Sequence, residues 1–585
     1  MKPVNPFRLG YNRKTGEPVI LYPEDLRAHL GAFASTGRGK SKTFEGFARH
    51  CLENRLPGIL FDPHGDSYRA VLRYATANHH TSRLVTVDPN EAGTHVFPLN
   101  VLAPNGSDPA VHAERIIAAI AKIFGQQDES KPRLERFLRA ALLSLLAAKL
   151  TMAELLDFVS LSDTSFRHAV LEQLPESADY VRQEWANFDS IKSSSERATL
   201  LEAVLNRVAR IVGNDCTRRV LGAPTFGLDW ATIRRERKFV LVNLQPSNRT
   251  SVECTRLLGT LILDNLTTYA LGLPEGENHT PFFILADELD ELVSADFALA
   301  LQAFRKRNVF VWCALQYLEQ LRAKDDTSKL YASVMANTDV KLVFHVSAED
   351  AERLCPEIFS GEVHGDHVKD EIHHSVFAPK ESERTIYGKS NSESELESDG
   401  TSQSTASGFG AGFLHSESIA DSETMNPNLQ MLNTAHIAGS TSASSRSESG
   451  SSGSSTSRST ARGRSTTESE VTVPFYEFER EQELSSRSYY SPEEIREGLI
   501  ADIQLQPQRH CFAKIGDSPA VPIVTAYIAP VRVREKDTRK TLERLRQRYT
   551  LPAEQVDRMI AERRTAHLLQ NGEDEVDDRE NWMPN

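Results

Sequence analysis

Residues 34–41, with the sequence ASTGRGKS, have the residue types and spacing of a loop that binds phosphate groups. Gly37 and Gly39 allow the backbone to curl with its N–H groups inward, and a following helix adds positive potential. Lys40 is placed to reach the β- and γ-phosphates of a nucleoside triphosphate, and Ser41 to bind Mg²⁺. Ala34 stands where glycine is usual, and we expect its small side chain to be tolerated. The residues expected to contact the nucleotide are Ser35, Thr36, Gly37, Arg38, Gly39, Lys40, Ser41 and Lys42.

A second group of chemical interest is the acidic pair that ends the apolar run 282–287. A carboxylate at the end of a buried strand can face the metal of a bound nucleotide, so Asp287 is a candidate metal ligand. Glu288 would then polarise the attacking water. The alternative is a strand that meets a solvated helix start, where acids favour the helix dipole. Beside a phosphate-binding loop we prefer the catalytic interpretation.

Two further groups are less specific. The basic cluster Arg305, Lys306 and Arg307 precedes an apolar run that ends at Gln316, which could sense the γ-phosphate, while Arg305 could act on the nucleotide of a neighbouring subunit. The alternative is a solvated basic turn with a satisfied glutamine. The motif DPHGD, with His64 between two aspartates, is either a metal or acid–base site or a turn with hydrogen-bonded Asp side chains, and we favour the turn.

The elements that must position these residues alternate in type. Short apolar runs at 29–34, 58–62 and 83–88 are each followed by a turn and a helical pattern, and buried runs resume at 238–243, 282–287, 309–315 and 339–346. This alternation predicts an α/β fold with a mostly parallel sheet flanked by helices. Between the two groups of strands the periodicity is helical, which predicts an all-α insertion.

We divide the chain by these patterns and by composition. Residues 381–472 are rich in Ser, Thr, Gly and Glu and cannot bury enough apolar surface to offset their ordering entropy, so this Ser-rich insert is expected to be disordered. The expected parts are N-terminal strands (1–30), the first part of the core (31–107), the helical insertion (108–237), the second part of the core (238–380), the Ser-rich segment (381–472), strands returning to the core (473–534), C-terminal helices (535–570) and a flexible acidic tail (571–585).

Bulk properties narrow the class of protein. The net charge of −14 argues against a surface coated with nucleic acid but leaves room for a local basic channel. The six cysteines show no metal-ligand spacing, which favours a reducing compartment. No stretch reaches the roughly 18 apolar residues of a membrane helix. We therefore expect a soluble, cytoplasmic protein.

Taken in order, the motifs resemble those of the HerA/FtsK superfamily of hexameric DNA-pumping ATPases, and most of all the TraD/TraG-type coupling proteins of conjugation and type IV secretion. The motifs are ASTGRGKS, DPHGD, FPLN, PRLERFLRAALLSLL, KFVLVNL, FFILADEL, AFRKRNVFVWCALQYLEQL and ANTDVKLVFHVSAEDAERL. The resemblance covers most of residues 20–380 and, more loosely, 473–570. Coupling proteins bound to membranes carry N-terminal transmembrane helices, a pattern missing from this sequence.

The resemblance implies a RecA-like P-loop core with an all-α insertion, ATP and Mg²⁺ as ligands, and a homo-hexameric ring around DNA. It implies Walker A roles for Lys40 and Ser41, and Walker B roles for Asp287 and Glu288. Arg305 would be the arginine that acts in trans, and Gln316 the polar sensor. Asn337 matches a family asparagine to which we assign no role.

The function expected from this resemblance is an ATPase that pumps DNA or a nucleoprotein substrate through the ring. Single- and double-stranded DNA both remain open. The alternative is a receptor that docks a relaxase or effector protein, using ATP for assembly, with peripheral association to a membrane secretion channel. A GTPase switch is disfavoured because no NKxD motif follows the P-loop at a suitable place. The basic residues Arg234, Arg235, Arg237 and Lys238 are candidate DNA contacts, although a solvated patch is the simpler interpretation.

Overall fold

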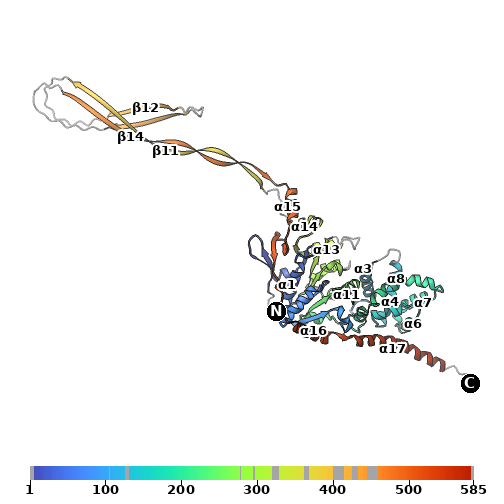
Figure 1. Cartoon of the computed structure of the whole chain (residues 1–585). Coiled ribbons are helices and arrows are strands. Elements are labelled where there is room, and N and C mark those ends of the chain that lie inside the picture. The colour runs from blue at the N-terminus through green and yellow to red at the C-terminus, as the bar shows by residue number, and fades with distance from the viewer. Residues whose placement is uncertain are drawn as a thin grey trace. The chain divides into compact units, whose positions relative to one another are not determined.

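The computed structural model describes residues 5–104, 106–125, 131–276, 279–293, 297–318, 329–360, 368–398, 414–424, 433–443 and 459–580 (Figure 1). The chain divides into two compact units. The first comprises residues 1–365 and 490–585, and the second comprises residues 366–489. Each unit is described by itself.

The first unit is built on a sheet of eleven strands in the order β2-β1-β16-β15-β10-β3-β9-β8-β4-β7-β5. Its strands are β1 (Phe7–Asn12), β2 (Pro18–Leu21), β3 (His29–Phe33), β4 (Gly58–Asp62), β5 (Leu84–Val87), β7 (Phe239–Asn243), β8 (Phe282–Asp287), β9 (Val309–Leu315), β10 (Thr338–Val343), β15 (His510–Ile515) and β16 (Val521–Thr525). The seven strands from β10 to β5 are all parallel. The remaining four add an antiparallel edge. The predicted α/β class with a mostly parallel sheet is confirmed.

Alternate side chains of the central strands pack into two separate hydrophobic cores, one on each face of the sheet. In β9, Val311 and Cys313 join one core, whereas Phe310 and Trp312 join the other. The second core is covered by α1 (Lys40–Glu53), where Phe47 stacks on Trp312 with ring centroids 3.5 Å apart. Burial on both faces explains why these strands read as continuous apolar runs.

Other helices complete the layers around the sheet. The core helices are α2 (Asp66–Ala77), α11 (Val252–Leu271), α12 (Phe297–Arg305), α13 (Lys329–Asn337), α14 (Ala348–Ile358) and α15 (Pro492–Gln504). The insertion between β6 (His95–Val96) and β7 consists of α3 (Pro109–Phe124), α4 (Lys131–Ala147), α5 (Leu155–Phe158), α6 (Ser165–Glu172), α7 (Asp179–Asp189), α8 (Ser194–Val212), α9 (Asp215–Gly222) and α10 (Trp230–Arg235), with short 3-10 turns. No helix among these described residues is long and apolar enough to cross a membrane.

The C-terminal helices α16 (Glu535–Tyr549) and α17 (Ala553–Glu580) return to the rest of the unit. Between them β17 (Leu551–Pro552) pairs with β6, and α17 then lies against the helical insertion. The tail predicted to be flexible from residue 571 is helical as far as Glu580. The helix overlaps the acidic tail, whose flexibility stays a prediction.

The second unit, in the residues that the structure describes, is an antiparallel ribbon. β11 (Val368–Ser398) pairs with β14 (Ser459–Tyr489), and β12 (Leu414–Thr424) pairs with β13 (Asn433–Ala443). The predicted long insert is confirmed as a unit of its own; its described residues pair as strands, and the other residues of 381–472 lie outside the described part. Main-chain bonds form the ribbon without a core, so it leaves no hydropathy signal. Residues 473–489 belong to this ribbon, and only β15 and β16 return to the sheet.

The contact between α17 and the insertion depends on a buried acid. Glu154 is fully buried, and Arg563 of α17 binds it with 2.8 Å between Nη2 and Oε1. Arg563 also donates to the carbonyl of Gly222. The neighbouring Arg564 makes a half-exposed pair with Asp157 at 3.4 Å.

We predict that Arg563→Ala lowers the apparent free energy of unfolding by about 3 kcal/mol, since it leaves the Glu154 carboxylate buried without its cation. Arg564→Ala is the matched control and should cost less than about 1 kcal/mol, because its pair is screened by solvent. Urea denaturation followed by tryptophan fluorescence measures both. Equal losses for the two variants would contradict this account of the contact.

Candidate nucleotide-binding site

The glycine-rich loop lies between β3 and α1, at the carboxyl edge of the parallel strands. Ala34 N donates to the carbonyl of Leu315 at 3.1 Å, and Ser35 N to that of His345 at 2.9 Å, which holds the start of the loop. Gly37 and Gly39 have φ values of 77° and 112°, a region that favours glycine. Ala34 is buried and has no positive φ, so glycine is not required there.

Lys40 and Asp287 face each other at the centre of this edge. The two side chains are buried, with 3.9 Å between Lys40 Nζ and Asp287 Oδ1, and neither atom has a hydrogen-bond partner in the structure. The other oxygen of Asp287 accepts a hydrogen bond from the hydroxyl of Ser41. Buried polar groups are normally satisfied, so this pair has the character of a site prepared for a ligand.

Glu288 and Gln316 lie next to this pair. The amide of Gln316 donates to Oε1 of Glu288, and Thr36 of the loop donates to Oε1 of Gln316 at 3.2 Å. Glu288 is 9% exposed and has a left-handed backbone, with φ of 70°. Such a conformation is costly for a residue with a side chain and occurs where a site constrains it. The structure thus connects the end of β9 and the end of β8 to the loop.

His64 joins the same group, which sequence reasoning did not foresee. Its Nε2 lies 3.1 Å from Oε1 of Glu288. The DPHGD segment also forms the turn that we favoured from the sequence. The Asp62 carboxylate accepts hydrogen bonds from the backbone N–H groups of His64 at 3.0 Å and Tyr68 at 2.7 Å. Asp66, by contrast, is exposed and pairs with Arg69. Among the described residues, no group of three His, Cys, Asp or Glu side chains could hold a metal alone.

The charges of the site shift the pKa values of two of these groups. Burial raises the pKa of Asp62, and the nearby carboxylate of Asp287 adds to the rise, against the backbone N–H groups that bind it. Burial opposes protonation of His64, but the charge and hydrogen bond of Glu288, with Asp287 and Asp62, raise its pKa on balance. The stability that protonated His64 contributes is therefore fully present below about pH 6.5 and lost as the pH rises through the folded-state pKa.

Arg305 does not join the site of its own chain. It ends α12 before β9, whereas Gln316 follows β9, and a seven-residue strand spans roughly 23 Å. Its side chain is half-exposed and binds Asp339 at 2.8 Å. Lys42, expected to contact nucleotide, pairs with Glu45 at 2.6 Å.

Two of the four candidate DNA contacts near α10 have buried side chains. Arg234 is buried and donates to the carbonyls of Thr280, Arg307 and Asn308. Lys238 is also buried and binds Glu236 at 2.7 Å. These two side chains are therefore unavailable to a nucleic acid, because Arg234 joins α10 to neighbouring segments and Lys238 is buried in a local ion pair.

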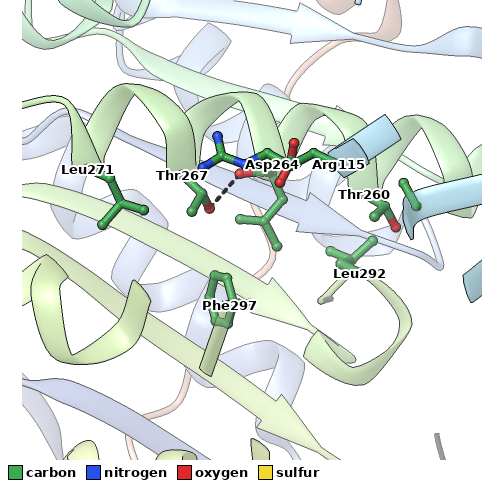
Figure 2. A pocket seen from close by; sticks show the side chains of 9 residues that line it. Arg115, Thr260, Asp264, Thr267, Leu271, Leu292 and Phe297 are labelled. Atoms are coloured by element: carbon green, nitrogen blue, oxygen red, sulfur yellow. Dashed lines mark hydrogen bonds between the residues drawn. The ribbon is translucent and has the colours of Figure 1, made fainter. Parts of the chain in front are cut away.

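A pocket elsewhere in the unit is too small for a nucleotide (Figure 2). Its volume is about 30 Å³, enough for one or two water molecules. It lies between α3, α11 and the segment that leads into α12, lined by Arg115, Ala119, Thr260, Leu263, Asp264, Thr267, Leu271, Leu292 and Phe297.

We predict that the raised pKa of His64 depends on Glu288. An NMR titration of the histidine ring signals, assigned with His64→Gln, should show His64 titrating above pH 6.5 in the wild type. Glu288→Gln should lower the pKa of His64, since it removes the nearest negative charge while the burial of His64, which lowers the pKa, is unchanged. The signal of His80, whose pKa burial lowers, serves as an internal control. An unchanged His64 titration in Glu288→Gln would refute the contact.

Comparisons with known proteins bear on this geometry. Residues 7–216 match the family model of the central domain of the helicase HerA. No curated protein matches the sequence.

Several solved structures are similar in fold. The bacterial conjugative coupling protein TrwBdeltaN70, in its unbound monoclinic form, has a TM-score of 0.48 and 13% identity over 90% of this chain and 91% of that chain. TrwB in complex with ADP and Mg²⁺ has a TM-score of 0.46 and 14% identity, over 91% of this chain and 98% of that one. VirB4 of Thermoanaerobacter pseudethanolicus has a TM-score of 0.38 and 16% identity, over 60% and 87%. These likenesses do not extend to ligands or partners. The resemblance to the HerA/FtsK superfamily is confirmed by the family model over residues 7–216, which contain the P-loop and most of the helical insertion.

Proposed function

We propose that the protein is an ATPase that pumps DNA, or a nucleoprotein substrate, through a ring of six subunits. The observation that carries the proposal is the buried pair of Lys40 and Asp287, whose facing atoms have no hydrogen-bond partners beside the glycine-rich loop. A triphosphate and its metal would supply the missing partners. The family match to a helicase domain supports a nucleic-acid substrate.

The residues present fit a bound Mg²⁺–ATP. Ser41 and Asp287 are joined by a hydrogen bond and carry the hard oxygen atoms that Mg²⁺ prefers. Lys40 lies one residue before Ser41 at the first turn of α1, where it would bind the phosphates. Bound Mg²⁺ would neutralise charge on the β- and γ-phosphates.

Glu288 is the residue that we assign to orienting the attacking water. It lies next to Asp287 and is held by Gln316 on one side and His64 on the other. A carboxylate fixed in this way can accept a proton from water that approaches the γ-phosphate. Gln316, which also binds Thr36 of the loop, is placed to respond when the γ-phosphate is lost.

The position of Arg305 supports a nucleotide site shared between neighbouring subunits of a ring. Its distance from the loop excludes a role in its own subunit, and its half-exposed guanidinium can be released from Asp339. An arginine presented to the nucleotide of a neighbouring subunit stabilises charge in the transition state. With one such residue on each subunit, a closed ring completes every site.

We predict that DNA stimulates ATP hydrolysis by the wild type and that salt weakens the stimulation, because grip on phosphates is electrostatic. Lys40→Ala should abolish hydrolysis by weakening nucleotide binding. Glu288→Gln should bind ATP but hydrolyse it at least roughly a hundredfold more slowly, since water is no longer activated. A colorimetric phosphate assay with single- and double-stranded DNA measures these rates.

Two outcomes would oppose the translocase. If DNA stimulates neither hydrolysis nor ring formation in the wild type, the protein is not a DNA pump. If hydrolysis is intact and insensitive to DNA while a relaxase or effector protein binds tightly, the alternative of a protein-substrate receptor is favoured.

We predict that Arg305→Ala lowers hydrolysis by roughly a thousandfold while each subunit still binds ATP. Mixing inactive Arg305→Ala subunits with inactive Lys40→Ala subunits should restore part of the activity, because some interfaces then combine an intact loop with an intact arginine. The matched control is Lys306→Ala, which removes a neighbouring exposed cation. If the mixture stays as inactive as its components, the site is not shared in this way.

A further inference from the structure

The C-terminal part of the chain reaches the glycine-rich loop. The side-chain amide of Gln508 donates to the carbonyl of Gly37 at 3.0 Å, across 471 residues of sequence. The backbone N–H of Arg509 donates to the carbonyl of Arg38 at 2.9 Å. The segment just before β15 is thereby fixed to the outer side of the loop, beside the start of α1.

Arg509 in turn holds the chain that follows β16. Its Nη2 donates to the carbonyl of Thr525 at 2.7 Å, and its own carbonyl accepts from Thr525 N at 2.9 Å. Its guanidinium carbon lies 5.3 Å from the ring centroid of Tyr527. Arg509 has φ of 67°, a costly backbone for a residue with a side chain. A cation and an aromatic ring are thus held together beside the loop.

The ring of Tyr527 is open to solvent, with 69% of the residue exposed. The guanidinium of Arg509 lies over this ring, and an exposed aromatic ring of this kind is a surface on which a nucleobase stacks well. A methyl group placed on Gly39 would lie 3.6 Å from Arg509 Cα and Cγ. Gly39 directly precedes Lys40, so the Arg509–Tyr527 pair lies within a short reach of the phosphate-binding residues.

We propose that the base of the bound nucleotide stacks on Tyr527, beside the guanidinium of Arg509. This inference rests on the proposed function, because it assumes that the loop holds a nucleoside triphosphate. The phosphates then lie against Lys40, the ribose passes Gly39, and the base meets the Arg509–Tyr527 pair. The C-terminal strands thereby supply the part of the site that distinguishes a nucleotide from a bare polyphosphate.

The test compares two ligands that share phosphates and differ in the base. Calorimetric titration with Mg²⁺–ATP and with Mg²⁺–tripolyphosphate gives an affinity for each. We expect Tyr527→Ala to weaken ATP binding roughly tenfold and to leave tripolyphosphate binding within twofold of the wild type. Tyr527→Phe keeps the aromatic face and should restore most of the ATP affinity.

The matched control is Tyr180→Ala on α7, which removes a tyrosine that is 59% exposed and far from the loop in sequence. It should change neither affinity. An equal effect of Tyr527→Ala on both ligands, or no effect on either, would overturn the stacking proposal while the loop still binds phosphate. Failure of the wild type to bind either ligand would instead refute the proposed function.

Discussion

The site depends on two opposite charges in a protein interior, Lys40 and Asp287, whose facing atoms have no hydrogen-bond partners. Taking Lys40 and Asp287 out of water is unfavourable unless other groups solvate them, and here only Ser41 binds the carboxylate. Such an arrangement persists only if the surrounding structure fixes both side chains. β3 and β8, which lead to these residues, are each hydrogen-bonded to β9 along their length. Burial on both faces of the sheet then keeps the strand ends together. The binding capacity of the loop is therefore a property of the whole central sheet.

The same carboxyl edge organises the groups that respond to the ligand. Thr36, Gln316, Glu288 and His64 form a continuous set of contacts over the ends of four strands. Because two donors share one oxygen of Glu288, a displacement of Gln316 leaves His64 as the remaining support. Arg305 lies at the opposite edge of the sheet, which is where the proposed head-to-tail ring would need a residue that acts on the neighbouring subunit.

Much of the fold and part of the candidate site could be predicted from the sequence. β4, β8 and β9 have the predicted bounds because they are buried on both faces and read as uninterrupted apolar runs. The sequence does not place His64 in the site. Its contact with Glu288 requires β4 to lie beside β8, and local periodicity does not predict the order of strands in a sheet. Arg509 and Tyr527 are still harder to find, because no local pattern indicates a contact across 471 residues. The β11–β14 ribbon escaped prediction because main-chain bonds carry no hydrophobic signature.

The contact between Gln508 and the glycine-rich loop has a consequence for the order of events during synthesis. The loop leaves the ribosome early, whereas β15 and β16, which complete the antiparallel edge beside β10, are made only after some 500 residues. A nascent chain therefore carries a phosphate-binding loop that lacks its contacts with Gln508 and Arg509 until those residues have been made. The topology thus delays completion of the surroundings of the loop until β15 and β16 have joined the sheet.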